Sequence, residues 1–160
     1  MRVCPGCGLE MPPRDDLSND TYYHASPECW SVYTEVLAAE YSNAVLFAQV
    51  HQRTVDAYAV QHAGGAHPDK SVAIHLAGLY LVIERGVRSP EVPPMLQRLA
   101  SSVETWPHFE PPRVAWTLTI FDVATASDHI AAVRAWSELV WKEWAFARDE
   151  IAALAARVNP

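Results

Sequence analysis

Residues 26–41 read SPECWSVYTEVLAAEY and mark the point where the helical part of the chain begins. Ser26 is a favoured N-cap residue, Pro27 suits the first helical position, and Glu28 places an acid near the positive end of the helix dipole. The apolar side chains that follow recur at helical spacing: Trp30, Tyr33, Val36, Leu37 and Tyr41. The stretch therefore predicts a helix, and its first turn carries Cys29, one of only three cysteines in the chain.

The residues before this helix show no apolar periodicity and are too few to build a core of their own. They include Pro12-Pro13 and the polar run Arg14-Asp15-Asp16. A segment of this kind needs a cross-link, such as a bound metal ion, to stabilise a single folded structure. We therefore predict a single domain over residues 1–160, with a metal-stapled headpiece over residues 1–28 and a helical bundle over residues 29–160.

The headpiece contains the sequence CPGCG at residues 4–8, whose two cysteines are spaced as in a metal-binding hairpin. Pro5 turns the chain, and the glycines let backbone amides point at the sulfur atoms. Cys29 lies in the first turn of the following helix, where the helix N-terminus favours the thiolate that metals require. With His24 close by in the sequence, we predict a closed site with the ligands Cys4, Cys7, His24 and Cys29.

The metal that we expect at this site is a single structural zinc ion, because closed sites of three cysteines and one histidine generally serve structure. Iron bound to the same four side chains is an alternative that the spacing leaves open. For the fourth ligand the sequence offers alternatives, since Glu28 or Asp20 could take the place of His24.

Two other interpretations of the cysteines are weaker. A redox-active C-x-x-C requires a helix that begins at the second cysteine, whereas Gly8 and Pro12-Pro13 follow Cys7. If the three thiols were unrelated, the proline-glycine hairpin of CPGCG would have no explanation. An odd number of cysteines also argues against a disulfide framework.

The rest of the chain predicts a mainly α protein, a compact bundle of four to five helices attached to an N-terminal zinc-knuckle headpiece. Ser42-Asn43 weakens or breaks the first helix, and helical periodicity resumes over residues 44–62. Further helices are expected over residues 70–85, about 94–103 and about 127–158, the last one carrying three tryptophans. Residues 104–123 are expected to form a long loop with one extended piece.

Composition excludes several classes of protein. The chain has 19 acidic and 12 basic residues, a formal charge of −7, and no basic run, so we expect no nucleic-acid partner. No segment approaches the roughly 20 apolar residues of a membrane span, and no signal peptide is recognisable, so we expect a cytoplasmic protein that does not bind membranes.

Several polar side chains of the bundle are candidate catalytic residues: His51, Asp56, Tyr58, His62 and His75. Three of them share one face of the helix over residues 44–62, but its two histidines lie roughly 16 Å apart and cannot share an ion. The helices carry no His-x3-His or Glu-x-x-His pair of the kind that holds metals in bundles. The simpler interpretation is that these histidines are buried hydrogen-bonding groups or helix-end residues.

The sequence resembles a family of small uncharacterised bacterial proteins known as a domain of unknown function. The matching stretches are CPGCG at residues 4–8, YHASPECW at 23–30, HQRTVDAYAVQH at 51–62, SVAIHL at 71–76 and the tryptophan-rich part at 133–144. The resemblance covers nearly the whole chain and implies one domain, but it implies no activity. A weaker likeness to helical-bundle metalloenzymes with three histidines lacks their His-x3-His pair.

Two functions are compatible with these observations. The first is a zinc-binding cytoplasmic helical protein with a structural metal site, which binds a partner protein or a small molecule. The alternative is a metal- or His/Asp-dependent enzyme with a pocket between helices lined by His51, His62 and His75. Whether the protein is an enzyme stays open at this point.

Overall fold

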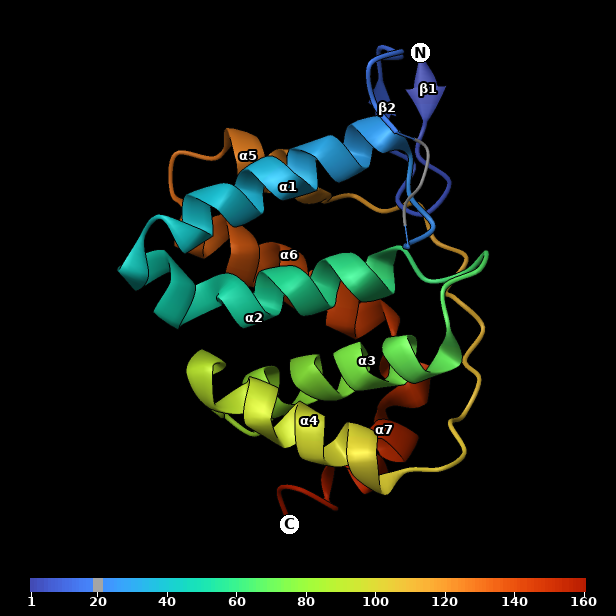
Figure 1. The fold of residues 1–160 in the computed structure, drawn as a ribbon, viewed down its shortest axis with the longest axis vertical. Coiled ribbons are helices and arrows are strands. Elements are labelled where there is room, and N and C mark those ends of the chain that lie inside the picture. The colour runs from blue at the N-terminus through green and yellow to red at the C-terminus, as the bar shows by residue number, and fades with distance from the viewer. Residues whose placement is uncertain (19–21) are drawn as a thin grey trace.

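The computed structural model describes residues 1–18 and 22–160 of the chain (Figure 1). The elements in these residues are β1 (Arg2–Val3), β2 (Glu10–Met11), α1 (Pro27–Tyr41), α2 (Ala44–Gln61), α3 (Asp69–Ile83), the 3-10 turn η1 (Ser89–Glu91), α4 (Val92–Ser102), α5 (Ile120–Thr125), α6 (His129–Glu143), the 3-10 turn η2 (Ala145–Ala147) and α7 (Arg148–Ala155). The predicted mainly α class is confirmed. The described residues form seven α-helices, more than the predicted four to five.

The N-terminal segment is a small β-hairpin beside the start of α1 (Figure 1). Its strands β1 and β2 pair antiparallel, with Arg2 opposite Met11 and Val3 opposite Glu10. These residues show no periodicity in the sequence, because strands of two residues are too short to show a period of two. An isolated hairpin is marginally stable in water, so this one depends on its attachment to the helices.

α2 is the central helix and packs against α1, α3 and α6. In Figure 1, α1, α2 and α3 lie one below the other, and α6 passes behind them. Apolar side chains between these helices are fully buried, among them Val50, Ala57, Leu76, Leu79, Trp136 and Val140. Burial of this face is the main source of stability of the helical part.

The sequence signals at the start of α1 and α2 behave as expected. The Ser26 hydroxyl accepts a hydrogen bond from the backbone N–H of Cys29 at 3.2 Å, which caps α1. The Asn43 side chain accepts hydrogen bonds from the backbone N–H groups of Val45 and Leu46 and caps α2. The weak point at Ser42-Asn43 is therefore a true break between two helices.

The C-terminal third differs from the prediction in two places. The end of the segment 104–123, predicted as a long loop with one extended piece, contains the start of a short helix, α5, because Thr119 and Asp122 form a reciprocal capping box there. The single final helix expected over residues 127–158 is divided into α6 and α7 by the turn η2, which follows the fully buried Trp144. Asp128 caps α6 through a hydrogen bond from the backbone N–H of Ala131.

The long segment between α4 and α5 is anchored to the helices at two points. Phe109 is buried in the core. Gln61, the last residue of α2, donates through its amide to the Leu118 carbonyl at 2.9 Å and accepts from the Trp136 indole N–H at 3.1 Å. The segment is therefore held against the C-terminal end of α2.

Among the described residues, no helix combines the length and the apolar character that crossing a bilayer requires.

Candidate metal centre

Four side chains from three separate segments meet between the hairpin and the first two helices. Cys4, Cys7, Cys29 and His62 are all buried, and one potential ligand atom from each lies within 4.8 Å of those of the other three. The Cys7 and Cys29 sulfurs are 3.7 Å apart, and the Cys29 sulfur is 3.3 Å from Nε2 of His62. The structure thus brings together the three predicted cysteines and one histidine.

The first two cysteines are positioned by the turn of the hairpin. The backbone N–H of Gly8 donates to the Cys4 carbonyl at 2.9 Å, and the N–H of Cys4 donates to the Leu9 carbonyl at 2.8 Å. No helix begins at Cys7, and α1 begins only at Pro27, so the redox-type arrangement is absent from the described residues. These bonds hold both thiols on the side of the turn that faces the helices.

The orientation of His62 leaves one ring nitrogen free for a ligand role. Nδ1 lies 2.8 Å from the Tyr58 carbonyl oxygen, which can only accept, so Nδ1 carries the proton. In the neutral imidazole, Nε2 then keeps its lone pair, and this nitrogen lies 3.3 Å from the Cys29 sulfur. Fixing the tautomer of a ligating histidine through a backbone carbonyl is a common feature of metal sites.

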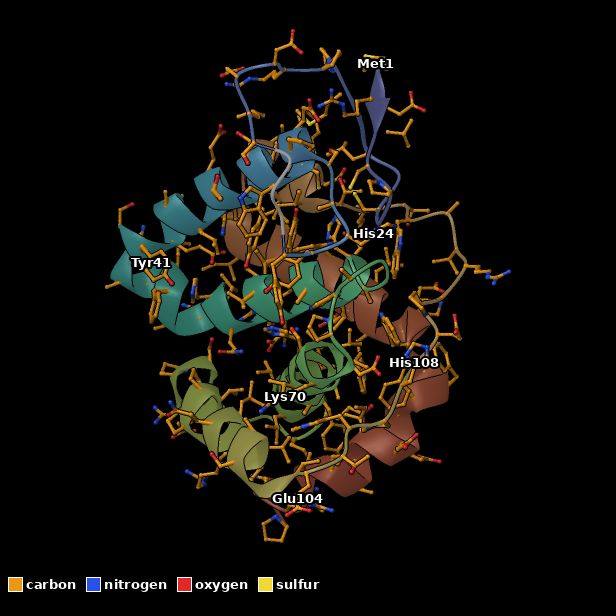
Figure 2. The ribbon with its side chains drawn as sticks, turned by 45° about the vertical axis from the view of Figure 1, so that its right-hand side comes forward. Met1, His24, Tyr41, Lys70, Glu104 and His108 are labelled. Atoms are coloured by element: carbon orange, nitrogen blue, oxygen red, sulfur yellow. The ribbon has the colours of Figure 1, made fainter. Side chains whose placement is uncertain are left out.

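The histidine in this group is His62 and not the predicted His24. The backbone N–H of His24 donates to the His62 carbonyl at 3.0 Å, and its imidazole lies against the backbone of Gly64 and Gly65, where it lines a surface pocket. His24 is thus directed away from the thiols, while His62 is directed toward them. Figure 2 shows His24 beside the N-terminal hairpin.

Glu28, one of the two predicted alternatives to His24, is not one of the four clustered residues. The Glu28 carboxylate accepts hydrogen bonds from the Arg2 guanidinium at 2.7 Å and from the Arg14 backbone N–H at 2.9 Å, which ties the hairpin to α1. Asp20 lies outside the described residues.

The lengths of the first two helices indicate that His62 lies near Cys29. α1 has 15 residues and α2 has 18, so they extend roughly 22 Å and 27 Å at about 1.5 Å per residue. Because a short connection makes neighbouring helices antiparallel, the end of α2 returns to the start of α1. A histidine at the end of α2 therefore lies near Cys29, although 33 residues separate them in sequence.

Two separations within the group are close to those around a tetrahedral metal ion. Bonds of about 2.3 Å to sulfur and about 2.0 Å to nitrogen place two sulfurs about 3.8 Å apart, and sulfur and nitrogen about 3.5 Å apart. The observed separations of 3.7 Å and 3.3 Å are close to these values. A disulfide needs about 2.05 Å between sulfurs, and all three cysteines are free thiols.

The electrostatics of the group also favour a cation. Hydrogen bonds with Cys29 and Cys7 lower the pKa of the Cys4 thiol, whereas the contacts of Cys29 with Cys4 and Cys7 raise the pKa of Cys29. One buried thiolate therefore forms readily, but it opposes ionisation of the others. A positive ion would remove this repulsion and allow all three thiols to ionise.

A comparison with known protein families covers this whole region. The sequence profile of DUF5946, described as a family of unknown function, matches residues 2–145. The chain belongs to the DUF5946 family. The resemblance to a domain of unknown function is thereby confirmed. All four clustered residues of this DUF5946 protein lie within the matched range, whereas α7 lies beyond it. No curated protein and no solved structure matches the chain.

Two further donors surround the sulfur atoms. The backbone N–H of Ser26 donates to the Cys4 sulfur at 3.4 Å, and the Tyr58 hydroxyl donates to the Cys29 sulfur at 3.5 Å. Burial, followed by the charge of Cys29, raises the pKa of Tyr58 and keeps its hydroxyl protonated as a donor. Tyr58, a candidate catalytic residue from the sequence, thus belongs to the surroundings of the thiol group.

Gly6 allows the close approach of the hairpin to α2. A Cβ at this position would lie 2.5 Å from the His24 carbonyl oxygen and 2.7 Å from Cδ2 of His62. We expect Gly6→Ala to lower the free energy of unfolding by about 1–3 kcal/mol and to weaken metal binding, measured by urea denaturation and chelator competition. Gly86→Ala is the control for metal affinity alone, since a Cβ there meets no atom within 4 Å but the φ of +65° strains alanine and lowers stability by itself. An unchanged metal affinity in Gly6→Ala would contradict this prediction.

The other candidate residues do not form a common pocket with His62. Nδ1 of His51 lies 2.8 Å from the Glu40 carboxylate, and Nδ1 of His75 lies 2.8 Å from the Asp56 carboxylate. The predicted pocket lined by His51, His62 and His75 is not supported, because each imidazole is directed at a different acidic or thiol group. Sequence spacing placed these histidines in helices but gave no information about their partners.

The carboxylates of Asp56 and Glu40 are both buried, and each accepts several hydrogen bonds. Burial raises the pKa of Asp56, and the hydrogen bonds from His75 and Gln52 oppose that shift. Glu40 likewise accepts hydrogen bonds from side chains of α2 and α6. His51 and His75 therefore serve as partners of buried carboxylates, in agreement with the simpler interpretation of the sequence.

Two histidines near the start of α3 should titrate at different pH values. Burial, with the nearby His75, lowers the pKa of His67 from its ordinary 6.5 to about 4, while hydrogen bonds to Asp69 and Glu110 raise the pKa of exposed His108. At pH 5, NMR should find His108 protonated and His67 neutral. Because the unfolded chain binds a proton at residue 67 first, this histidine reduces stability as the pH falls from about 6.5 to 4. A His67 that titrates near 6.5 would contradict this expectation.

Proposed function

We propose that this DUF5946 member is a zinc-binding helical protein in which Cys4, Cys7, Cys29 and His62 hold one structural zinc ion. The observation that supports the proposal is the buried group of four ligand atoms, all within 4.8 Å of one another. Three thiolates and one imidazole are the ligand types that zinc prefers, and the separations of the atoms suit its tetrahedral geometry.

A structural role for the ion follows from the closed ligand set. Four protein ligands fill a tetrahedral site and leave no position for water or substrate, which a catalytic zinc ion would require. The ligands come from the hairpin, from the first turn of α1 and from the residue after α2, so the ion would attach the hairpin, which lacks a core of its own, to the two helices. Binding free energy at such a site becomes folding free energy.

The proposed biochemical role is that of a cytoplasmic binding module for a partner protein or a small molecule. Thiols that serve as metal ligands persist in a reducing compartment. The formal charge of −7 makes nucleic acid an unsuitable partner.

The test is the metal content of protein purified anaerobically without chelators. Elemental analysis should find one zinc ion per chain, and the cobalt-substituted protein should show the absorption of a tetrahedral thiolate complex. A chain free of metal after purification, and unable to bind added Zn²⁺ or Co²⁺, would end the proposal. One iron per chain would keep the site and replace zinc with the alternative ion.

A further inference from the structure

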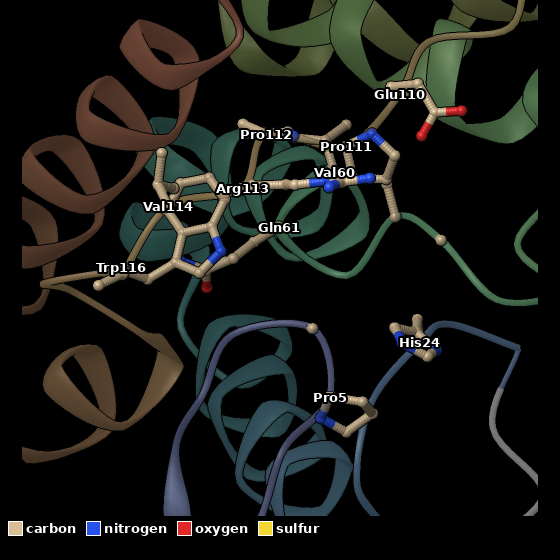
Figure 3. A pocket seen from close by; sticks show the side chains of 14 residues that line it. Pro5, His24, Val60, Gln61, Glu110, Pro111, Pro112, Arg113, Val114 and Trp116 are labelled. Atoms are coloured by element: carbon tan, nitrogen blue, oxygen red, sulfur yellow. The ribbon is translucent and has the colours of Figure 1, made fainter.

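A pocket of about 520 Å³ opens beside the hairpin turn that carries Cys4 and Cys7 (Figure 3). One wall consists of Pro5 and Gly6 from the hairpin turn together with His24. The opposite wall is the segment 110–116, and the end of α2 forms the base. The volume is in the range of pockets that hold small molecules.

Two side chains that can donate hydrogen bonds, Arg113 and His24, line this space. Neither the Arg113 guanidinium nor the His24 imidazole makes a hydrogen bond or ion pair with any residue in the described part of the chain. Figure 3 shows the two on opposite sides of the pocket, with Arg113 on the side of the long segment and His24 on the side of the hairpin. Their free donors suit an anion, since arginine binds planar oxyanions through paired hydrogen bonds.

The acidic residue at the pocket does not neutralise these donors. The carboxylate of Glu110 lies 3.1 Å from Nε2 of His108, and its side chain is 80% exposed. The amide group of Gln61 is also occupied, because its two ends bond to Leu118 and Trp136. An anion in the pocket would therefore meet free donors at Arg113 and His24.

The remaining lining is apolar and includes one aromatic side chain. Pro5 and Val60 provide hydrocarbon on the hairpin side and at the base, and Pro111, Val114 and Trp116 provide it on the other side (Figure 3). The half-buried indole of Trp116 presents a surface on which a flat ring can pack. Such a lining favours a ligand with an apolar or aromatic body.

The pocket is formed by parts of the chain that are fixed in place. The His24 backbone is bonded to the His62 carbonyl, and a Cβ on Gly65 would lie 2.6 Å from Nδ1 of His24, so the glycine leaves room for the ring. The opposite wall is held by buried Phe109 and by the bond between Gln61 and Leu118. A preformed pocket reduces the entropy lost on binding.

We propose that this pocket binds an oxyanion, a carboxylate or a phosphate, that is attached to an apolar or aromatic body. Arg113 and His24 bind the anion from opposite sides, and the body packs against Trp116 and the neighbouring prolines. The site is distinct from the metal centre, although the hairpin turn that carries Cys4 and Cys7 contributes one wall.

The experiment is an NMR titration of the purified full-length chain with four small probes. Benzoate and phenyl phosphate test the two oxyanions on one aromatic body, benzamide is the neutral analogue of benzoate, and benzylamine is the cationic analogue. We expect one or both anions to shift the Trp116 indole and His24 ring signals to saturation. Benzamide should bind about tenfold more weakly or not at all, and benzylamine should not bind.

A pair of arginine variants tests the assignment of the site. Arg113→Gln should weaken binding of the favoured anion by about tenfold or more, whereas Arg98→Gln, an exposed arginine on α4, should leave it unchanged. Matching spectra of the free proteins show that both variants keep the fold. The proposal is overturned if neither anion binds, if benzamide binds as well as benzoate, if benzylamine binds at the site, or if both variants behave alike.

Discussion

A Cys29→Ser variant is expected to lose its metal ion and about 4 kcal/mol of unfolding free energy, which lowers Tm by roughly 8–16 °C. Cys29 contacts both the Cys7 sulfur and the His62 ring nitrogen, so its removal breaks the link between hairpin, α1 and α2. The remaining thiols would be left in a buried space without a cation. Metal analysis and thermal unfolding measured by circular dichroism give the two readouts.

Two histidine variants provide the matched control. His62→Gln should release the metal and destabilise the protein in the same direction as Cys29→Ser, whereas His24→Gln should retain one ion per chain. The reason is that Nε2 of His62 faces the thiols, whereas the His24 imidazole faces the neighbouring pocket. Loss of metal from His24→Gln with retention in His62→Gln would reverse the ligand assignment that the structure supports.

Replacing Glu40 with leucine is expected to lower the free energy of unfolding by about 3–5 kcal/mol. The Glu40 carboxylate is fully buried and accepts hydrogen bonds from the Thr54 hydroxyl at 2.6 Å and from ring nitrogens of His51 and His129, each at 2.8 Å. Leucine would leave these three donors inside the protein without an acceptor, and each unsatisfied group costs about 1–3 kcal/mol. Urea denaturation measures the change.

The control for Glu40 lies on the same helix. Glu35 is exposed, and Glu35→Leu should change the unfolding free energy by no more than about 0.5 kcal/mol. Glu40→Gln should fall between the two variants, because the amide keeps one acceptor oxygen and the shape of the side chain. Equal stabilities of Glu40→Leu and Glu35→Leu would show that the buried carboxylate does not organise α1, α2 and α6.

The features that the sequence predicted correctly depend on local signals. The Ser26 cap and the break at Asn43 are decided by side chains that bond to backbone groups a few residues away. The grouping of Cys4, Cys7 and Cys29 follows from hairpin spacing and from a position in the first turn of a helix. Each of these can be recognised within a short window of sequence.

The features that the sequence missed depend on contacts between distant segments. His62 replaces His24 because the antiparallel return of α2 brings its end to the thiols, whereas closeness in sequence favoured His24. The final helix is interrupted beside buried Trp144, at a position where the helical pattern continues without a proline or a glycine. The partners of His51 and His75 also lie on other turns or other helices, outside any local window.

The order of the ligands along the chain determines when the site can be completed as the protein is synthesised. All three thiols leave the ribosome before the imidazole at residue 62, which follows only after the whole of α2 has been made. Because domains fold as the chain emerges, the nascent chain holds only three of the four ligands until α2 has paired with α1. For the metal site proposed above, full coordination would coincide with the formation of this helix pair, and we expect the partly folded chain to bind the metal more tightly than the free N-terminal peptide does.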